Sequence, residues 1–316
     1  MPKYELKFKT EIVKDFSGNE VEVVRGSSME GFEPKIGKVR DVYDLNDNSL
    51  LIVASDRISA FDAVYPDLIP YKGKSLTALS KYWFEQTRHI IQNHLIEQIN
   101  ERTIRVKKAK RIDVEFIVRA YLYGSLWRDY RDGRRQFGDI KLPDGMQMAE
   151  RLPRLMFTPT TKAETGHDAE ISKEEAVKQK LIDSEVMWYM IKHNCFELFR
   201  FYSEAANKKG LIIPDFKLEF GIDMQIDEPP THDSARWWAK QHYGIGQKQE
   251  ANCLDKEFWR EASKRLGYSG GEGEAPRMPQ AVIDETSKRC VGLAKVLMGK
   301  AKVGDLNLRS VDDVVN

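Results

Sequence analysis

Charged and apolar residues alternate strictly between residues 215 and 220. A β-strand turns every second side chain to the same face, so one face of this segment is apolar and the other carries Asp215, Lys217 and Glu219. Three charges on a strand that is otherwise suited to a protein core are too many for plain packing, because buried charges need partners or a metal. The pattern therefore indicates a functional site.

A second pair of acids, Asp227-Glu228, follows a turn. If this turn is centred on Asp223, Glu219 and Asp227 lie opposite each other in an antiparallel pair, with Cβ atoms about 5 Å apart. Two carboxylates at that distance can share a cation, and a small oxygen-only ligand set favours magnesium carried by a nucleotide over zinc. We expect Glu219 and Asp227 to be metal ligands, with Glu228 as the alternative if the register differs by one residue.

An arginine follows these acids closely. Arg236 ends the segment Asp233-Ser234-Ala235-Arg236, and its guanidinium is suited to bidentate capture of a phosphate. The alternative interpretation is an ion-paired hairpin in which Lys217 only neutralises its acidic neighbours. That alternative leaves the nearby arginine unexplained.

Two cations near the start of the chain are spaced to follow a polyphosphate. Residues 36–45 are expected to form a strand, 46–48 a turn and 50–54 the returning strand. Lys38 and Arg40 then share one strand face, about 7 Å apart. A solvated strand face is the alternative interpretation.

Composition narrows the class of protein. The chain has 316 residues, which predicts one large domain or two joined domains, and its formal net charge is only +1. No overall field therefore draws it toward nucleic acid or an anionic membrane. Three scattered cysteines without metal-type spacing are typical of free thiols in a reducing compartment. With neither a signal core nor a membrane-spanning run in the sequence, we expect a cytoplasmic protein.

Periodicity gives a coarse set of elements. Helical spacing predicts helices over 75–94, 186–208 and 279–298, and a capping box at 172–175 predicts one more helix start. Alternation over 112–118 predicts a strand, whereas 153–168 is expected to be an ordered loop. The basic stretch 105–111 is interpreted as a solvated strand entry, with contact to RNA as the alternative.

Five separate motifs, in the same order along the chain, resemble the SAICAR synthetases of purine biosynthesis. The resemblance covers about residues 36–260 and includes the segments discussed above. The motifs are Gly37-Lys38-Val39-Arg40-Asp41, Ser55-Asp56-Arg57-Ile58-Ser59-Ala60-Phe61-Asp62, Val118-Arg119 with Gly124-Ser125, Thr158 to Asp168, and Asp215-Phe216-Lys217-Leu218-Glu219-Phe220-Gly221.

The resemblance implies a fold and a reaction. The fold is α+β, with two joined lobes and a kinase-like ATP cleft between them: residues 1–120 with a nucleotide-covering hairpin, and 121–316 with the metal and substrate residues and a C-terminal helical extension. The reaction joins carboxyaminoimidazole ribonucleotide (CAIR) to L-aspartate, with ATP and Mg²⁺ as cofactors. The expected partners are these small molecules, without nucleic acid or membrane, and the sequence does not indicate the oligomeric state.

The resemblance also implies roles for individual residues at matching positions. The residues expected to bind ATP are Lys38, Arg40, Asp215 and Lys217. Those expected to act in catalysis are Lys217, Glu219 and Asp227, of which Glu219 and Asp227 hold the metal. Those expected on the substrate side are Arg119, Ser125 and Arg236 at the ribonucleotide phosphate, Lys162, His167 and Asp168 in a pocket loop, and Ser59 and Asp62 in a further loop.

This chemistry needs no side-chain nucleophile. A carboxylate is a poor electrophile, so the expected route phosphorylates it from ATP and lets the aspartate amine displace phosphate from the acyl phosphate. The sequence departs from the family pattern at His232, where a proline is familiar, at Ala235, where a serine is, and in a short turn before Asp227. The rival functions are a phosphotransferase of related fold, such as an inositol phosphate kinase, and a non-catalytic RNA-binding relative.

Overall fold

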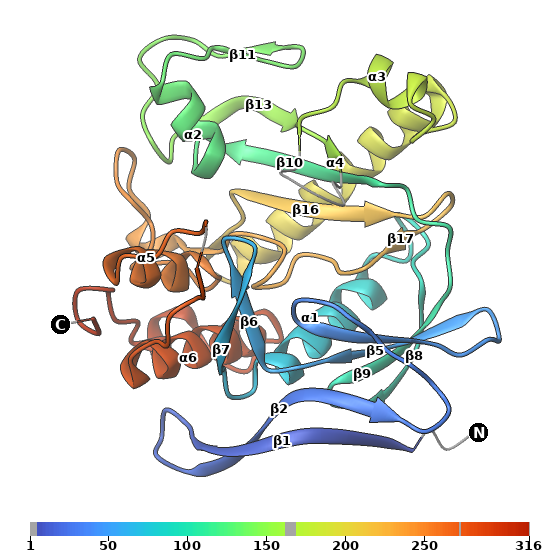
Figure 1. Cartoon of the computed structure of the whole chain (residues 1–316). Helices are drawn as coiled ribbons and strands as arrows, with labels where there is room; N and C mark the ends of the chain where they lie inside the picture. Colours follow the sequence, from blue (N-terminus) through green and yellow to red (C-terminus); the bar gives the residue numbers. More distant parts are fainter. Residues whose placement is uncertain (1–4, 162–168, 272, 316) are drawn as a thin grey trace. The chain divides into compact units, whose positions relative to one another are not determined.

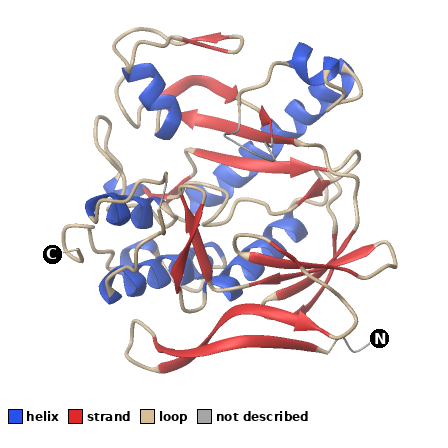
Figure 2. Ribbon diagram, viewed as in Figure 1, coloured by secondary structure: helices blue, strands red, loops and turns tan. Residues whose placement is uncertain are grey.

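The computed structural model describes residues 5–161, 169–271 and 273–315, which form a mixture of helices and antiparallel strands (Figures 1 and 2). The chain divides into two compact units, each made of non-contiguous segments. Unit 1 comprises Met1–Tyr82, His94–Lys108 and Glu250–Asn316, and unit 2 comprises Trp83–Asn93 and Ala109–Gln249. The expected single division at residue 120 does not coincide with these units, because the chain crosses between them more than once.

Unit 1 is built on the five-stranded antiparallel sheet β3-β4-β5-β9-β8 and two separate hairpins, β1-β2 and β6-β7. One of its helices, α1, follows the β6-β7 hairpin, and α5, α6 and η2 lie in its C-terminal segment. The elements are β1 (Leu6–Lys14), β2 (Glu20–Met29), β3 (Lys35–Ile36), β4 (Arg40–Asp44), β5 (Ser49–Ala54), β6 (Arg57–Ala60), β7 (Ala63–Leu68), α1 (Lys72–Gln86, whose last turn belongs to unit 2), β8 (Leu95–Asn100), β9 (Thr103–Lys107), α5 (Glu257–Arg265), α6 (Gln280–Leu297) and the 3₁₀ helix η2 (Val303–Leu306).

Unit 2 is built on the sheet β13-β10-β16-β17, in which β14 also pairs with β10. Figure 1 shows β13, β10 and β16 side by side, with the long helix α4 crossing behind them. The elements are β10 (Val114–Tyr121), α2 (Gly124–Arg131), β11 (Gln136–Phe137), β12 (Ile140–Lys141), β13 (Arg151–Phe157), β14 (Thr160–Thr161), α3 (Lys173–Lys178), α4 (Glu185–Lys208), β15 (Leu211–Ile212), β16 (Asp215–Phe220), β17 (Gln225–Ile226), β18 (Trp238–Ala239) and the 3₁₀ helix η1 (Lys240–His242).

The core of unit 2 lies between α4 and the apolar face of the sheet. The ring of Phe216 in β16 lies 5.2 Å from that of Phe199 and 5.9 Å from that of Tyr202, both on α4. Burying one such ring stabilises the fold by about 2–3 kcal/mol. Ser184 caps the start of α4 by accepting a hydrogen bond from the N–H of Met187 at 3.2 Å, and Gly210, with φ +76°, allows the chain to turn away after its end.

The predicted strand 215–220 and the predicted starts of α3, α4 and α6 are confirmed to within a residue or two. Other predictions are wrong in detail. Residues 36–45 do not form one strand, because a turn at Gly37 to Arg40 separates β3 from β4, so Lys38 does not share a strand face with Arg40. The expected loop 153–168 contains most of β13 and all of β14, since both segments pair with β10. Among the described residues, no helix combines the length and apolar character needed to cross a membrane.

Candidate active site

The antiparallel pair β10-β16 carries a row of charged side chains on one face. In this pair Ile117 lies opposite Lys217, and Arg119 lies opposite Asp215. The same register brings Glu115 next to Lys217, whose ammonium donates to the Glu115 carboxylate at 2.8 Å. The residues that alternate with them, Phe116 and Val118 on β10 and Phe216 and Leu218 on β16, are buried in the core, so the charged side chains lie on the opposite face of the sheet. Acids therefore surround Lys217 at one end of the row, and two arginines lie at the other.

Lys217 is the centre of the acidic end. Its Nζ lies 2.8 Å from Glu115 Oε1 and 3.1 Å from Glu219 Oε1, and the Glu219 side chain is only 5% exposed. Burial opposes the charge on Lys217, but Glu219, Asp227 and Glu115 together raise its pKa above the usual range. Lys217 is therefore a permanent cation among three carboxylates.

The register of β17 differs from the expected one. Glu219 pairs with Ile226 and not with Asp227, because the turn between β16 and β17 is tight, with the N–H of Gly221 donating to the carbonyl of Met224. Asp227 leaves the strand with φ +61°. Even so, its charge contributes to the raised pKa of Lys217, which places it with the acidic cluster.

Glu228 has a different environment. Its Oε2 accepts a hydrogen bond from Thr231 Oγ1 at 2.7 Å, and the residue is only 7% exposed. This contact holds the loop that leads to Arg236. Of the two neighbouring acids, Asp227 is therefore the better candidate for a metal ligand.

The donor set of this cluster fits Mg²⁺ chemistry. Its ligating atoms are carboxylate oxygens, which are the hard ligands that Mg²⁺ prefers, and Mg²⁺ commonly uses one or two carboxylates with water and phosphate oxygens completing the shell. Among residues 5–161, 169–271 and 273–315, no three His, Cys, Asp or Glu side chains form a complete metal cage. Glu219 and Asp227 would thus supply part of a shell that a nucleotide completes.

The other end of the row is an arginine cluster around Asp215. Arg236 Nη1 donates to both oxygens of Asp215, at 2.9 and 2.7 Å, and Arg119 Nη1 lies 3.7 Å from the same carboxylate. Arg119 also donates to Thr158 Oγ1 at 3.0 Å and to Ser125 Oγ at 3.3 Å. Burial lowers the pKa of Arg119 below its usual value; Asp215 opposes this shift and Arg236 adds to it. Two guanidiniums held by one acid leave a net positive site for an anion.

Backbone contacts fix Arg236 in this cluster. The N–H of Arg236 donates to the carbonyl of Asp215 at 3.1 Å, and the N–H of Lys217 donates to the carbonyl of Ser234 at 2.9 Å. The guanidinium packs on Gly124 at the start of α2, where an added Cβ would lie 2.5 Å from Nη2. Only glycine fits there, also because its φ is +62°. The arginine is therefore held against the N-terminus of α2, which itself favours anions.

The two departures from the family pattern leave this geometry intact. His232 is 1% exposed and lies beside Asp233 at 3.4 Å, while Ala235 pairs with Phe216 by a β-bridge. Ser234 Oγ holds the loop by donating to the carbonyl of Pro229 at 2.7 Å. None of these contacts depends on a proline or serine at the two altered positions.

The structure separates two of the residues predicted to bind ATP. Asp215 lies with the arginines, whereas Lys217, two residues later on the same strand face, lies with the acids. The assignment of Asp215 to ATP stays a prediction, but its observed contacts are with the side chains expected at the ribonucleotide phosphate.

In unit 1, Lys38 lies in the turn between β3 and β4, and Arg40 begins β4. The Lys38 ammonium lies 2.5 Å from Asp62 Oδ1, in an exposed ion pair. Asp62 belongs to the β6-β7 turn with φ +62°, and the buried Ser59 lies in β6, opposite Val64. Both predicted substrate-side residues are thus near the β6-β7 turn. The pocket-loop residues Lys162, His167 and Asp168 lie outside the described residues.

Two residues of the clusters carry no role in the sequence prediction. Glu115 alternates with the apolar residues of β10, so the polar phase of that strand was the signal that could have revealed it. Thr158 falls within a recognised motif, but its contact with Arg119 depends on the pairing of β10 with β13, which one sequence does not reveal.

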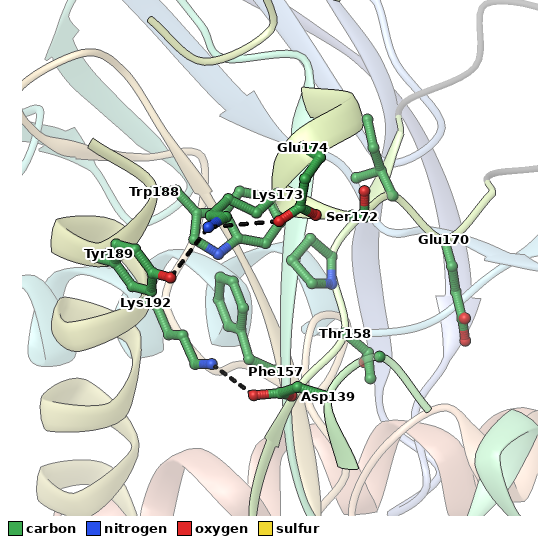
Figure 3. Close-up of a pocket in the computed structure, with 13 residues that line it drawn as sticks. Asp139, Phe157, Thr158, Glu170, Ser172, Lys173, Glu174, Trp188, Tyr189 and Lys192 are labelled. Atoms are coloured by element: carbon green, nitrogen blue, oxygen red, sulfur yellow. Dashed lines mark hydrogen bonds and ion pairs between the residues drawn. The ribbon is translucent and has the colours of Figure 1, made fainter. Parts of the chain in front are cut away.

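A pocket of about 610 Å³ lies beside β13 and α4, and the described residues predicted from the sequence do not line it. Figure 3 shows its aromatic wall, formed by Phe157 and Trp188, and two lysines that are already engaged. Lys173 lies 3.2 Å from the hydroxyl of Tyr189, and Lys192 lies 3.6 Å from Asp139. Lys173 also lies 2.7 Å from Glu185 Oε2, so acids balance both cations, and neither of these two lysines of the described lining is left to select a ligand.

Comparison with known proteins identifies relatives along most of the chain. The SAICAR synthetase sequence family matches residues 34–275. The phosphoribosylaminoimidazole-succinocarboxamide synthase of Thermodesulfovibrio yellowstonii is 39% identical over 280 residues, covering 83% of this chain and 93% of the relative. The enzyme of the same name from Neisseria meningitidis serogroup C is 38% identical over 272 residues, covering 80% and 92%. The SAICAR-synthase structure from Saccharomyces cerevisiae, complexed with SAICAR, has a TM-score of 0.77 and 31% identity, covering 89% and 99%.

The charge balance around Lys217 predicts a pH-dependent loss of stability in the variant Lys217→Met. Removing the cation leaves Glu115, Glu219 and Asp227 repelling one another, at a cost of about 3 kcal/mol, the low end for a buried pair because Lys217 is 29% exposed. Protonation of a carboxylate removes its charge, and in the folded variant, where the three acids lie together, it relieves a repulsion that the unfolded chain does not have. We expect the melting temperature to fall further below that of the parent protein as pH rises from about 5 to 8.

The matched control is Lys192→Met, which removes a lysine of similar exposure, 27%, from a single exposed acid. It should lower the melting temperature slightly and equally at each pH. A Lys217→Met protein whose loss is as small and as independent of pH as that of the control would contradict the charge balance.

Proposed function

The chain belongs to the SAICAR synthetase family, and from this membership we propose which of its residues carry the family's reaction. That reaction is the ATP-dependent ligation of CAIR with L-aspartate, giving SAICAR, ADP and phosphate in purine biosynthesis. The observation that carries the proposal is the divided row of charges along β10-β16: a lysine lies among acids at one end, and at the other Arg119 of β10 is joined by Arg236 from the segment before β18. Two different anionic groups therefore have separate sites.

The arginine cluster is the proposed site of the ribonucleotide phosphate. Arg119 and Arg236 are planar, permanently charged donors, and Ser125 adds a hydroxyl at the first turn of α2. A phosphate there can replace contacts with Asp215 or add to them. By binding the phosphate of CAIR, this site would hold the imidazole carboxylate of the same molecule in a fixed position relative to ATP.

The acidic end is the proposed site of the ATP phosphates and their Mg²⁺. Glu219 and Asp227 would hold the ion, and Lys217 would neutralise charge on the transferred phosphoryl group. Bound Mg²⁺ supplies electrostatic stabilisation of the phosphate oxygens, which is worth several kcal/mol in such reactions. Lys38 and Arg40 of unit 1 are proposed to contact the same nucleotide from the turn between β3 and β4.

The proposed reaction balances in two steps. A carboxylate oxygen of CAIR attacks the γ-phosphorus, forming an acyl phosphate while the bond to the β-phosphate oxygen breaks and ADP leaves. The amine of aspartate then attacks the acyl carbon, loses a proton and expels inorganic phosphate. Both steps gather negative charge, which the fixed cations Lys217, Arg119 and Arg236 stabilise without forming a covalent bond.

The remaining roles follow from family membership alone. Ser59 and Asp62 are proposed on the substrate side near the β6-β7 turn, and Lys162, His167 and Asp168 in the pocket loop. The rival RNA-binding function gains no support from the basic stretch 105–111, because Arg105, Lys108 and Arg111 lie beside Asp47, Asp44 and Asp113. A cytoplasmic location is proposed from the biosynthetic reaction and from three cysteines that form no disulfide.

The proposed function predicts the substrate requirement of ATP turnover. Purified protein with Mg²⁺ and ATP should release ADP rapidly only when CAIR and L-aspartate are both present, and the product should contain the new amide. Each component is omitted in turn, and ADP and SAICAR are quantified by chromatography. Turnover on an inositol phosphate without CAIR would instead support the rival phosphotransferase.

Arg236→Ala tests the phosphate site. Losing one charge-assisted contact of about 1.5–3 kcal/mol should raise the KM for CAIR roughly ten- to hundredfold, while the KM for ATP stays nearly constant. Arg200→Ala is the control, because Arg200 is an exposed arginine of unit 2 that pairs with Glu197 on α4. Equal kinetics of the two variants would remove Arg236 from this role.

Glu219→Gln tests the metal site. The amide keeps the shape but removes a charged ligand, so kcat should fall at least about a hundredfold, as a loss of about 3 kcal/mol implies. Binding of Mn²⁺ with ATP, followed by electron paramagnetic resonance, should weaken as well. Glu228→Gln, which alters the neighbouring acid that accepts from Thr231, should keep most of the activity; the reverse ranking would identify Glu228 as the ligand.

A further inference from the structure

The turn between β3 and β4 is held by hydrogen bonds that a later segment of unit 1 donates to its backbone carbonyls. Gly37 and Arg40 close the turn with a hydrogen bond of 2.7 Å from the N–H of Gly37 to the carbonyl of Arg40. The other three carbonyls of the turn, those of Gly37, Lys38 and Val39, all accept hydrogen bonds from the segment that begins at Ser55. A turn of this kind usually leaves such carbonyls to water.

Arg57 supplies two of these contacts with one guanidinium. Its Nε donates to the carbonyl of Lys38 at 3.1 Å, and its Nη2 donates to the carbonyl of Gly37 at 3.0 Å. Its Nη1 donates to the carbonyl of Arg25 in β2. The planar fork of an arginine can make these bonds at once, whereas a lysine presents a single point charge.

Asp41 holds the guanidinium in place. Asp41 Oδ1 accepts from Arg57 Nη2 at 2.8 Å, and the two side chains are only 2% and 10% exposed. The other carboxylate oxygen accepts from the N–H of Ser27 at 2.7 Å and from its hydroxyl at 2.9 Å. A buried ion pair with its remaining lone pairs satisfied is rigid, so Arg57 has little freedom to move away from the turn.

Ser55 completes the support. Both its N–H, at 3.0 Å, and its hydroxyl, at 2.8 Å, donate to the carbonyl of Val39. The side chain of Lys38 meanwhile takes part in the ion pair with Asp62, where the two side chains are 53% and 78% exposed. An exposed ion pair of this kind contributes little to stability, so the ammonium can exchange that partner while the backbone beneath it stays fixed.

We propose that Arg57 and Ser55 are positioning residues for ATP: they hold the backbone of residues 37–39 so that Lys38 is presented to the nucleotide phosphates. This inference rests on the proposed function of Lys38. It also gives a physical reason why the motif at Gly37 to Asp41 occurs with the motif at Ser55 to Asp62: the second supports the first. Neither Arg57 nor Ser55 needs to touch a substrate for this role.

The test is the variant Arg57→Lys, which keeps a positive charge beside Asp41 but cannot reach both carbonyls. Calorimetric titration with ATP and Mg²⁺, without CAIR, should show a dissociation constant raised about tenfold, as expected when the presentation of one phosphate contact is lost. In steady-state assays the KM for ATP should rise in parallel, while the KM for CAIR changes by less than about twofold, a division that a general loss of stability would not produce.

Arg102→Lys is the matched control. Arg102 is another buried arginine of unit 1, with a side chain 6% exposed, and it pairs with Asp56 and donates to the carbonyl of Ala54 without contacting the turn. It should lower the melting temperature and leave the affinity for ATP unchanged. If Arg57→Lys and Arg102→Lys lose stability alike and bind ATP like the parent protein, the inference is overturned.

Ser55→Ala tests the same positioning role if Arg57→Lys does not fold. It removes the hydroxyl contacts with the carbonyl of Val39 and with the N–H of Arg57, so we expect a folded protein whose dissociation constant for ATP rises about threefold; an unchanged constant would overturn the inference.

Failure of the proposed function would give a different result. A parent protein that binds ATP but makes no amide from CAIR and aspartate would contradict the ligase function. An active ligase with normal ATP binding in both variants would contradict only the role of Arg57 and Ser55.

Discussion

The organisation of the candidate site depends on one constraint: buried or half-buried charges must be balanced within hydrogen-bonding distance. Lys217 meets it by lying among Glu115, Glu219 and Asp227. Asp215 meets it by binding Arg236 and lying close to Arg119. Because Glu115, Arg119, Asp215, Lys217 and Glu219 lie on β10 and β16, the register of this strand pair fixes most of the charges, and the segment after β17 adds Asp227 and Arg236.

This arrangement suits a reaction that joins two anionic substrates. With the assignment proposed above, segregation of the cations would give the ribonucleotide phosphate and the ATP phosphates different partners, so that one would not compete for the site of the other. The apolar face of the same strands packs on α4 through Phe216. This packing fixes the backbone of the strands and so the positions of the charged side chains on their other face. Such fixed placement determines how well charges stabilise a transferred phosphoryl group.

Much of the site could be predicted from the sequence where a short period decides the structure. The alternation at 215–220 predicts both the strand and its charged face, because every second residue must point the same way. The one-residue register of Asp227 could not be predicted, since β17 pairs through only two residues. Nor could the turn at Lys38, whose carbonyls are held by Arg57 and Ser55 from a later segment. Long-range partners of this kind leave no periodic signal in a single sequence.

The most direct measurement is a crystal structure of the protein with ADP, Mg²⁺ and the ribonucleotide bound. The account predicts Mg²⁺ at about 2.0–2.1 Å from carboxylate oxygens of Glu219 and Asp227, with the ribonucleotide phosphate on Arg119 and Arg236. A structure with the metal bound elsewhere, or with the nucleotide phosphates on the arginine cluster, would contradict the division of charge on β10-β16.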